Sequence, residues 1–263
     1  MRMLILFLFG FVLVLAGCAP EAPRFYRPEP LPRLAGVIGG QLHLSGEVVV
    51  ADDVRIAPGA ELVIEPGTTL WIMPAGSTKI EPDFLSPRTE ILVQGRLRIA
   101  GSEEEPVRFA TLRPQLDVAP GDPLWAGIIV VDGGRAELSH VRLQAADYGL
   151  WLLEGEGRLR AVEFADCRYG IAVQAEGHLE LADSLLRGGE IGLFCPGPGA
   201  VQLRQVRFDG QDEEGIHIGS SCRIAGEDVA VERARVGVAA AERPAFIRFG
   251  DNGRDFLRLR RRP

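Results

Sequence analysis

The densest group of side chains that could do chemistry lies in the stretch DGQDEEGIHI, residues 209–218. It contains Asp209, Asp212, Glu213, Glu214 and His217. Carboxylates and an imidazole at this spacing could hold a divalent cation or supply a general base. The stretch is also a turn lengthened by one residue, where acidic side chains are simply solvated. We favour the turn and keep Asp209, Asp212 and Glu214 as a candidate cation site.

The remaining histidines and cysteines show no ligand spacing. His43, His140 and His178 are interpreted as surface or edge residues. Cys195 belongs to a column of apolar residues expected to face the core, whereas Cys167 and Cys222 fall in turns before and after repeat glycines. Because a disulfide needs Cα atoms within about 7 Å, this register predicts three unpaired thiols. No metal or other cofactor is expected.

A glycine followed by mostly apolar residues returns along the second half of the chain. The glycines are Gly127, Gly149, Gly170, Gly192, Gly215 and Gly237, separated by 22, 21, 22, 23 and 22 residues. A repeat of this length indicates a solenoid, because one repeat cannot bury its apolar face without stacking on its neighbours. The regular spacing therefore predicts stacked coils of about 22 residues.

Two further ladders lie between the glycines. One comprises Leu138, Leu159, Leu181, Leu203 and Ile224, and the other begins at Val141, Val162, Ser184, Val206 and Val229. Short segments of period two separated by turns predict three strands per coil. A leucine-rich repeat is disfavoured because the chain has a single Asn, and coils of about 18 residues in left-handed hexapeptide helices do not fit. The expected fold is all-β, a right-handed parallel β-helix.

The N-terminal half follows the same pattern. Residues 48–72 alternate strictly and contain Pro-Gly turns at 58–59 and 66–67. Together with the coils, these stretches resemble right-handed parallel β-helix proteins of the pectin-lyase-like superfamily, over residues 40–241. The resemblance implies a scaffold that hosts polysaccharide lyases, hydrolases and epimerases elsewhere, but it carries no chemistry by itself.

The motifs of those enzymes are missing here. Polygalacturonase-type hydrolases use Asn-Thr-Asp and Arg-x-Lys elements, whereas the single Asn of this chain is Asn252 and its single Lys is Lys79. Pectate-type lyases need carboxylates that converge on Ca²⁺. The position one past the third strand holds Gln144, Ala165, Arg187, Asp209 and Glu232, which is no carboxylate column. No catalytic residue is therefore assigned.

The N-terminus reads as an export signal. An apolar run from Leu4 to Val14 is too short to span a bilayer comfortably. The following Leu-Ala-Gly-Cys resembles the lipobox of bacterial lipoproteins, which implies cleavage before Cys18 and acylation of its thiol. Ala19 after the cysteine favours the outer membrane by analogy. The expected organisation is a signal peptide at 1–17, a lipidated cysteine and Pro-rich linker at 18–36, the β-helix at 37–243 and a C-terminal cap or tail at 244–263.

The outer side of the glycine-led strands is expected to be apolar. If positions one and three after each glycine face the core, positions two and four face outward. The outward residues are Ile129, Val131, Trp151, Leu153, Ala172, Gln174, Phe194, Pro196, His217, Gly219, Ala239 and Ala241. An apolar strip of this size should be covered, either by residues 244–263 or by a ligand or partner. Trp151 and Phe194 are expected at the centre of the contact, with Leu153 and His217 beside them.

These observations favour a non-catalytic envelope lipoprotein whose solenoid is a scaffold or binding surface for a protein or a polysaccharide. A carbohydrate-active enzyme with an unfamiliar site is the first alternative, and a periplasmic accessory factor is the second. The formal net charge of −7 disfavours nucleic acid as a partner, because phosphate binding needs a basic surface. The membrane is expected as a partner through the lipid anchor.

Overall fold

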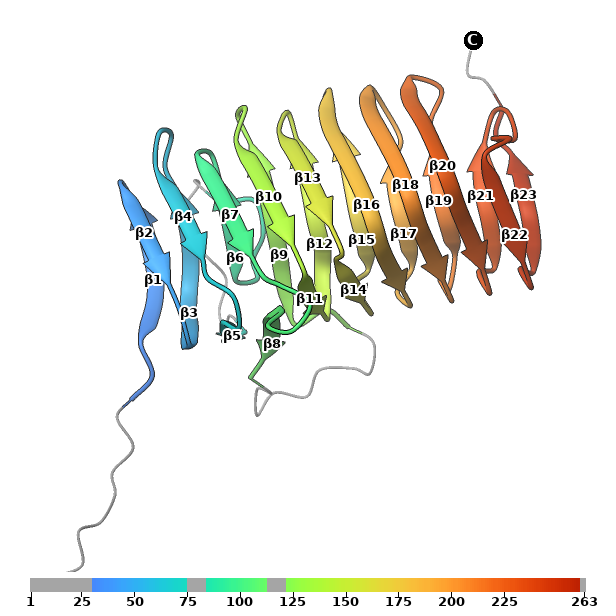
Figure 1. The fold of residues 1–263 in the computed structure, drawn as a ribbon. Coiled ribbons are helices and arrows are strands. Elements are labelled where there is room, and N and C mark those ends of the chain that lie inside the picture. The colour runs from blue at the N-terminus through green and yellow to red at the C-terminus, as the bar shows by residue number, and fades with distance from the viewer. Residues whose placement is uncertain (1–29, 75–83, 113–121, 261–263) are drawn as a thin grey trace, which may run out of the picture. The chain divides into compact units, whose positions relative to one another are not determined.

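The protein is a parallel β-solenoid. A computed structural model describes residues 30–74, 84–112 and 122–260, which form strands and turns and no helix. Strands pair in parallel with the coils before and after them, giving about 9 turns of roughly 22 residues. Figure 1 shows the coils stacked in chain order. The predicted all-β parallel solenoid is confirmed.

The strands run from Arg33 to Arg258. They are β1 (Arg33–Ile38), β2 (Gln41–Leu44), β3 (Glu47–Ile56), β4 (Glu61–Ile64), β5 (Thr69–Ile72), β6 (Glu90–Val93), β7 (Arg96–Ala100), β8 (Val107–Thr111), β9 (Trp125–Val131), β10 (Arg135–Ser139), β11 (Val141–Gln144), β12 (Ala146–Leu153), β13 (Glu156–Arg160), β14 (Glu163–Ala165), β15 (Tyr169–Gln174), β16 (Gly177–Arg187), β17 (Ile191–Cys195), β18 (Gly199–Asp209), β19 (Glu214–Ile218), β20 (Cys222–Glu232), β21 (Val236–Ala240), β22 (Ile247–Gly250) and β23 (Arg254–Arg258). None of the described residues forms a helix that is long and apolar enough to cross a membrane.

Two stacks of strands matter for function. The glycine-led sheet contains the second half of β3 and the strands β6, β9, β12, β15, β17, β19, β21 and β23. The second sheet contains β7, β10, β13 and the first halves of β16, β18 and β20. In both, alternate residues face the shared core, as the period of two in the sequence requires.

The second ladder differs from the prediction at its last rung. Leu138, Leu159, Leu181 and Leu203 pair in register as expected, but Leu203 is followed by Gly226 and not by Ile224. This coil is longer, so counting from Leu203 by the shorter repeat was wrong. The ring of Phe246 occupies the space that a side chain on Gly226 would need.

The corners of the coils are made by residues with left-handed backbone. One corner stacks His140, Ala161, Asp183, Gln205 and Asp228, with φ of 50°, 52°, 53°, 53° and 52°. Non-glycine residues adopt this conformation at a cost, and they do so here because each coil must change direction within one residue. The repeated cost is offset by the core that the stacked coils bury.

The C-terminal segment extends the solenoid. β22 pairs with β20, and β23 pairs with β21, so this segment adds strands at the end of the stack. Phe246, Phe249 and Phe256 pack against the core from there. Through residue 260 the C-terminal segment therefore does not lie across the outer face of the glycine-led sheet, which was one of the two alternatives for the cover of that face. The predicted signal peptide and Cys18 lie outside the described residues, and β1 begins within the stretch assigned to the linker.

Candidate functional site

The inward and outward assignment of the glycine-led sheet is confirmed. Leu150, Leu152 and their counterparts in other coils are buried in the main core. Trp151 and Phe194 point to the opposite side of the sheet and are partly exposed. In register, Trp151 follows Ile129 of the preceding coil and His217 follows Phe194. Ile129, Trp151, Phe194 and His217 thus lie on the outward face as predicted.

Five rings form a continuous row on this face, which we call the aromatic row. Its members are Tyr148, Trp151, Tyr169, Phe194 and His217. Ring centroids are 4.8 Å apart for Tyr148 and Trp151, and 5.2 Å apart for Tyr148 and Tyr169. The row continues through contacts of 5.2 Å and 5.1 Å to Phe194 and His217. Such contacts hold each ring in place before any ligand arrives.

The N-terminal end of the same face is covered by the protein itself. Ile129 and Val131 point outward but are buried in a small cluster with Leu92 and Ala126. Phe84, Trp151 and Leu153 pack against this cluster. The cover at this end comes from the segment that begins at Phe84, which the sequence did not suggest because that segment has no counterpart in other coils. The aromatic row begins where this cover ends.

A buried carboxylate holds the covering segment against the sheet. Asp147 accepts hydrogen bonds from Arg88 at 2.6 Å and from Arg168 at 2.6 Å, and its side chain is only 11% exposed. Arg168 also pairs with Glu190 at 3.3 Å. These charges run along one side of the aromatic row.

The tyrosines of the row keep their protons well above neutral pH. Burial raises the pKa of Tyr148, and the neighbouring Tyr169 and Asp147 raise it further. Burial likewise raises the pKa of Tyr169, with Glu190 acting in the same direction. Both hydroxyls are therefore available as neutral hydrogen-bond donors beside the rings.

His217, at the far end of the row, is oriented by a carboxylate. Its Nδ1 lies 2.7 Å from Oε2 of Glu214, and the two side chains are 23% and 19% exposed. A carboxylate at Nδ1 favours the proton on that nitrogen and leaves Nε2 as the acceptor. The histidine can thus accept a hydrogen bond from a ligand hydroxyl at the edge of the row.

Two other acids of the stretch 209–218, Asp209 and Glu213, are paired with arginines. Asp209 pairs with Arg233 and, at 3.4 Å, with Arg207, while Glu213 pairs with Arg235 at 3.4 Å. The backbone N–H of Asp212 donates to the carbonyl of the preceding coil. No group of three His, Cys, Asp or Glu side chains within the described ranges has an arrangement that could hold a metal ion. The structure does not bring Asp209, Asp212 and Glu214 together as a cation site.

The prediction of three unpaired thiols is wrong. Cys195 and Cys222 form a disulfide, with Cα atoms 6.0 Å apart. Cys222 begins β20 and pairs with Gly199 of β18, and a side chain on Gly199 would lie 3.3 Å from Sγ of Cys195. The side chains of Cys195 and Cys222 therefore meet in the same space inside the solenoid. Gly199 has no side chain to fill that space. Cys167 is buried and free.

Of the predicted binding residues, Trp151, Phe194 and His217 lie in the aromatic row, and Leu153 packs beside its covered end. Tyr148 and Tyr169 were not predicted from the sequence, although both directly precede a repeat glycine. That position marks an outward column of its own. Comparisons of this chain with protein-family models, with curated proteins and with solved structures find no match.

Proposed function

We propose that this protein is a lipid-anchored lipoprotein of the bacterial cell envelope whose solenoid is a non-catalytic binding surface for a protein or a glycan. The observation that carries the proposal is the aromatic row, in which five partly exposed rings contact one another across successive coils. Tyr and Trp supply large amphipathic contact areas with little conformational freedom to lose.

The scaffold beneath the row supports a binding role. The rings stand on parallel strands whose inner side chains are buried, so the backbone under them is rigid. Trp151 Nε1 donates a hydrogen bond to Gln174 Oε1 at 3.0 Å, which fixes the indole. A surface already held in its bound geometry loses less entropy on binding than a mobile one.

Two features support the envelope as the location. The Leu-Ala-Gly-Cys stretch that ends at Cys18 resembles a lipobox, and the disulfide between Cys195 and Cys222 requires an oxidising compartment to form and persist. We also propose that the solenoid is right-handed and similar to the pectin-lyase-like superfamily, with an anchor in the outer membrane.

A second candidate function is a carbohydrate-active enzyme. The pair of His217 and Glu214 favours it, since a histidine oriented by a carboxylate is the arrangement of a general base. The pair lies on an open face of the sheet, and the neighbouring acids Asp209 and Glu213 are already paired with arginines. No second catalytic group is therefore found beside the pair among the described residues. We therefore place binding first.

The test is a binding screen with paired tryptophan variants. The protein is screened on arrayed envelope polysaccharides and on purified envelope proteins, with detection of new reducing or unsaturated ends. Trp151→Ala is expected to weaken binding by about tenfold or more. Trp71→Ala, which removes an outward tryptophan from β5, is the matched control and should bind normally. Equal binding by both variants would show that the aromatic row does not bind the ligand. New reducing or unsaturated ends would favour the carbohydrate-active enzyme.

A further inference from the structure

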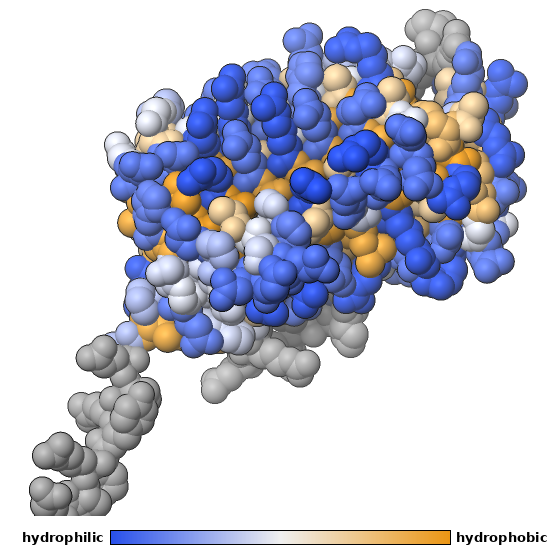
Figure 2. All heavy atoms as spheres, in the orientation of Figure 1, coloured by the Kyte–Doolittle hydropathy of each residue, from blue (hydrophilic) through white to orange (hydrophobic). Residues whose placement is uncertain are grey.

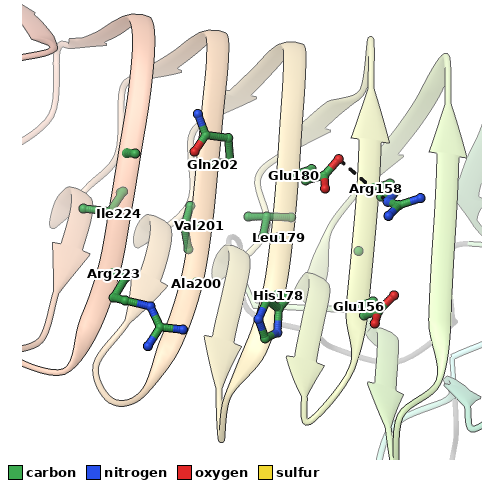
Figure 3. A pocket seen from close by; sticks show the side chains of 12 residues that line it. Glu156, Arg158, His178, Leu179, Glu180, Ala200, Val201, Gln202, Arg223 and Ile224 are labelled. Carbon is green, nitrogen blue, oxygen red and sulfur yellow. Dashed lines mark ion pairs between the residues drawn. The ribbon is translucent and has the colours of Figure 1, made fainter.

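The outer face of the second sheet carries a groove of about 430 Å³ that crosses β13, β16, β18 and β20. Its floor is low where Ala200 and Ala225 replace longer side chains of neighbouring coils. His178 pairs in register with Ala200, and Ala200 pairs with Arg223, so the two polar residues flank the alanine. In Figure 3 the side chain of Arg223 extends from its own strand toward that of Ala200.

The charges of the groove are unequal. Glu180 pairs with Arg158 at 3.7 Å, and Glu156 pairs with Arg135 at 3.2 Å. Across the described ranges, by contrast, Arg223 and His178 take part in no ion pair or side-chain hydrogen bond. A guanidinium stays charged at every physiological pH. The end of the groove over Ala200 therefore has an unmatched positive charge.

The long outward side chains around this groove are polar or charged, unlike those of the aromatic row. Hydrophilic side chains cover most of the face in view in Figure 2, with smaller hydrophobic patches among them. Within the groove, Gln202 and Glu180 stand on the side opposite His178 and Arg223 (Figure 3). An amide and a carboxylate there can hydrogen-bond to hydroxyl groups. The volume is that of a site for a small molecule.

The positions of His178 and Arg223 favour a tetrahedral anion over a planar carboxylate. His178 and Arg223 stand on strands two coils apart, so their Cα atoms are separated by about twice the 4.8 Å spacing between strands. A carboxylate bound side-on to the guanidinium uses both of its oxygens there and has only their second lone pairs left for the imidazole. A tetrahedral phosphate can give oxygens to the guanidinium and still present another toward the imidazole.

We propose that this groove binds a phosphorylated sugar, with the phosphate over Ala200 between His178 and Arg223 and the sugar hydroxyls against Gln202 and Glu180. The site is separate from the aromatic row, because it lies on the second sheet. Its ligand is soluble and carries both a tetrahedral anion and several hydroxyl groups.

Calorimetric titration of the full-length protein in detergent tests this proposal. The probes are glucose phosphorylated on its primary hydroxyl, glucuronate, glucose, inorganic phosphate, and vesicles that contain phosphatidylglycerol. The phosphorylated glucose is expected to bind most tightly, inorganic phosphate more weakly, and glucose not at all. Arg223→Ala should lower the affinity for phosphorylated glucose by about tenfold or more, and His178→Ala should lower it several-fold.

Arg98→Ala is the matched control, since it removes an exposed arginine from the same sheet outside the groove. It should bind phosphorylated glucose normally, as should Trp151→Ala, which tests the aromatic row alone. Melting curves show whether each variant is folded. Glucuronate binding as tightly as the phosphorylated sugar, binding to vesicles alone, or unchanged affinity in a folded Arg223→Ala protein would overturn the proposal.

Discussion

Arg88 and Asp147 join the segment that covers one end of the aromatic face to the sheet beneath it, through a hydrogen bond of 2.6 Å between Nη1 and Oδ2. The carboxylate is nearly buried, and Arg168 contacts its other oxygen. Two residues after Arg88, the carboxylate of Glu90 accepts hydrogen bonds from the backbone N–H groups of Leu85 and Ser86, at 3.0 Å and 2.8 Å. The covering segment is thus fastened by charge as well as by the packing of Phe84.

Asp147→Ala is expected to lower the free energy of unfolding by about 3 kcal/mol, because it leaves two arginines without their shared carboxylate. It should also loosen the cover next to Trp151 and shift its fluorescence to longer wavelength. Glu213→Ala serves as the control. That residue pairs with Arg235 at 3.4 Å, but its side chain is 50% exposed, so the expected loss is below about 1 kcal/mol. Similar losses of unfolding free energy in both variants, measured by denaturant unfolding, would show that Asp147 does not hold the covering segment in place.

The disulfide should contribute to stability by linking adjacent coils. Cys195 and Cys222 are 27 residues apart, and closing a loop of this length is worth about 3.5 kcal/mol in the chain-entropy model. The double variant Cys195→Ala with Cys222→Ala should therefore melt at a lower temperature. Peptide mapping without reductant should recover the two cysteines in one linked peptide, and finding both as free thiols would disprove the bond.

The thiol of Cys167 should be inert in the folded protein. Burial raises its pKa from 9.0 to about 12, so at pH 8 only about one molecule in ten thousand carries the reactive thiolate. The folded protein holds the thiol proton of Cys167 more tightly than the unfolded chain does. The protonated thiol therefore contributes to the stability of the folded protein below pH 9, and this contribution is lost as the pH rises toward 12. Thiol labelling at pH 8 should be fast only after denaturation, and Cys167→Ala should weaken the alkaline loss of stability. Rapid labelling of the native protein would contradict the burial.

The corners offer a direct test of the backbone. Ala161 has φ of 52°, a region that costs an alanine about 1 kcal/mol but costs a glycine almost nothing. Ala161→Gly should therefore stabilise the protein slightly, whereas Ala161→Val should destabilise it. In the flat part of β15, Ala172→Gly should destabilise instead. Thermal melting distinguishes these signs, and a destabilising Ala161→Gly would contradict the left-handed corner.

The repeated features of the coils could be predicted from the sequence, whereas features that occur in one coil only could not. The glycine column and the alternation around Leu150 and Trp151 were readable, because stacking forces equivalent positions into the same environment. The pairing of Cys195 with Cys222 was missed since a longer coil shifts the register, which also displaced Ile224. Phe84 could not be placed, because its segment has no equivalent in other coils. Individual corners and insertions depend on local contacts that a repeat does not encode.

The binding role of the aromatic row is tested most directly by a protein in which Trp151 is the sole tryptophan. The chain has three tryptophans, so Trp71→Phe and Trp125→Phe together leave only the indole of the row. Titration with the polysaccharide or envelope protein found in the screen should shift the emission of Trp151, and adding Phe194→Ala should weaken the apparent affinity by about tenfold. A ligand that binds without changing this emission, and with the same affinity when Phe194 is replaced, would contradict the proposed surface.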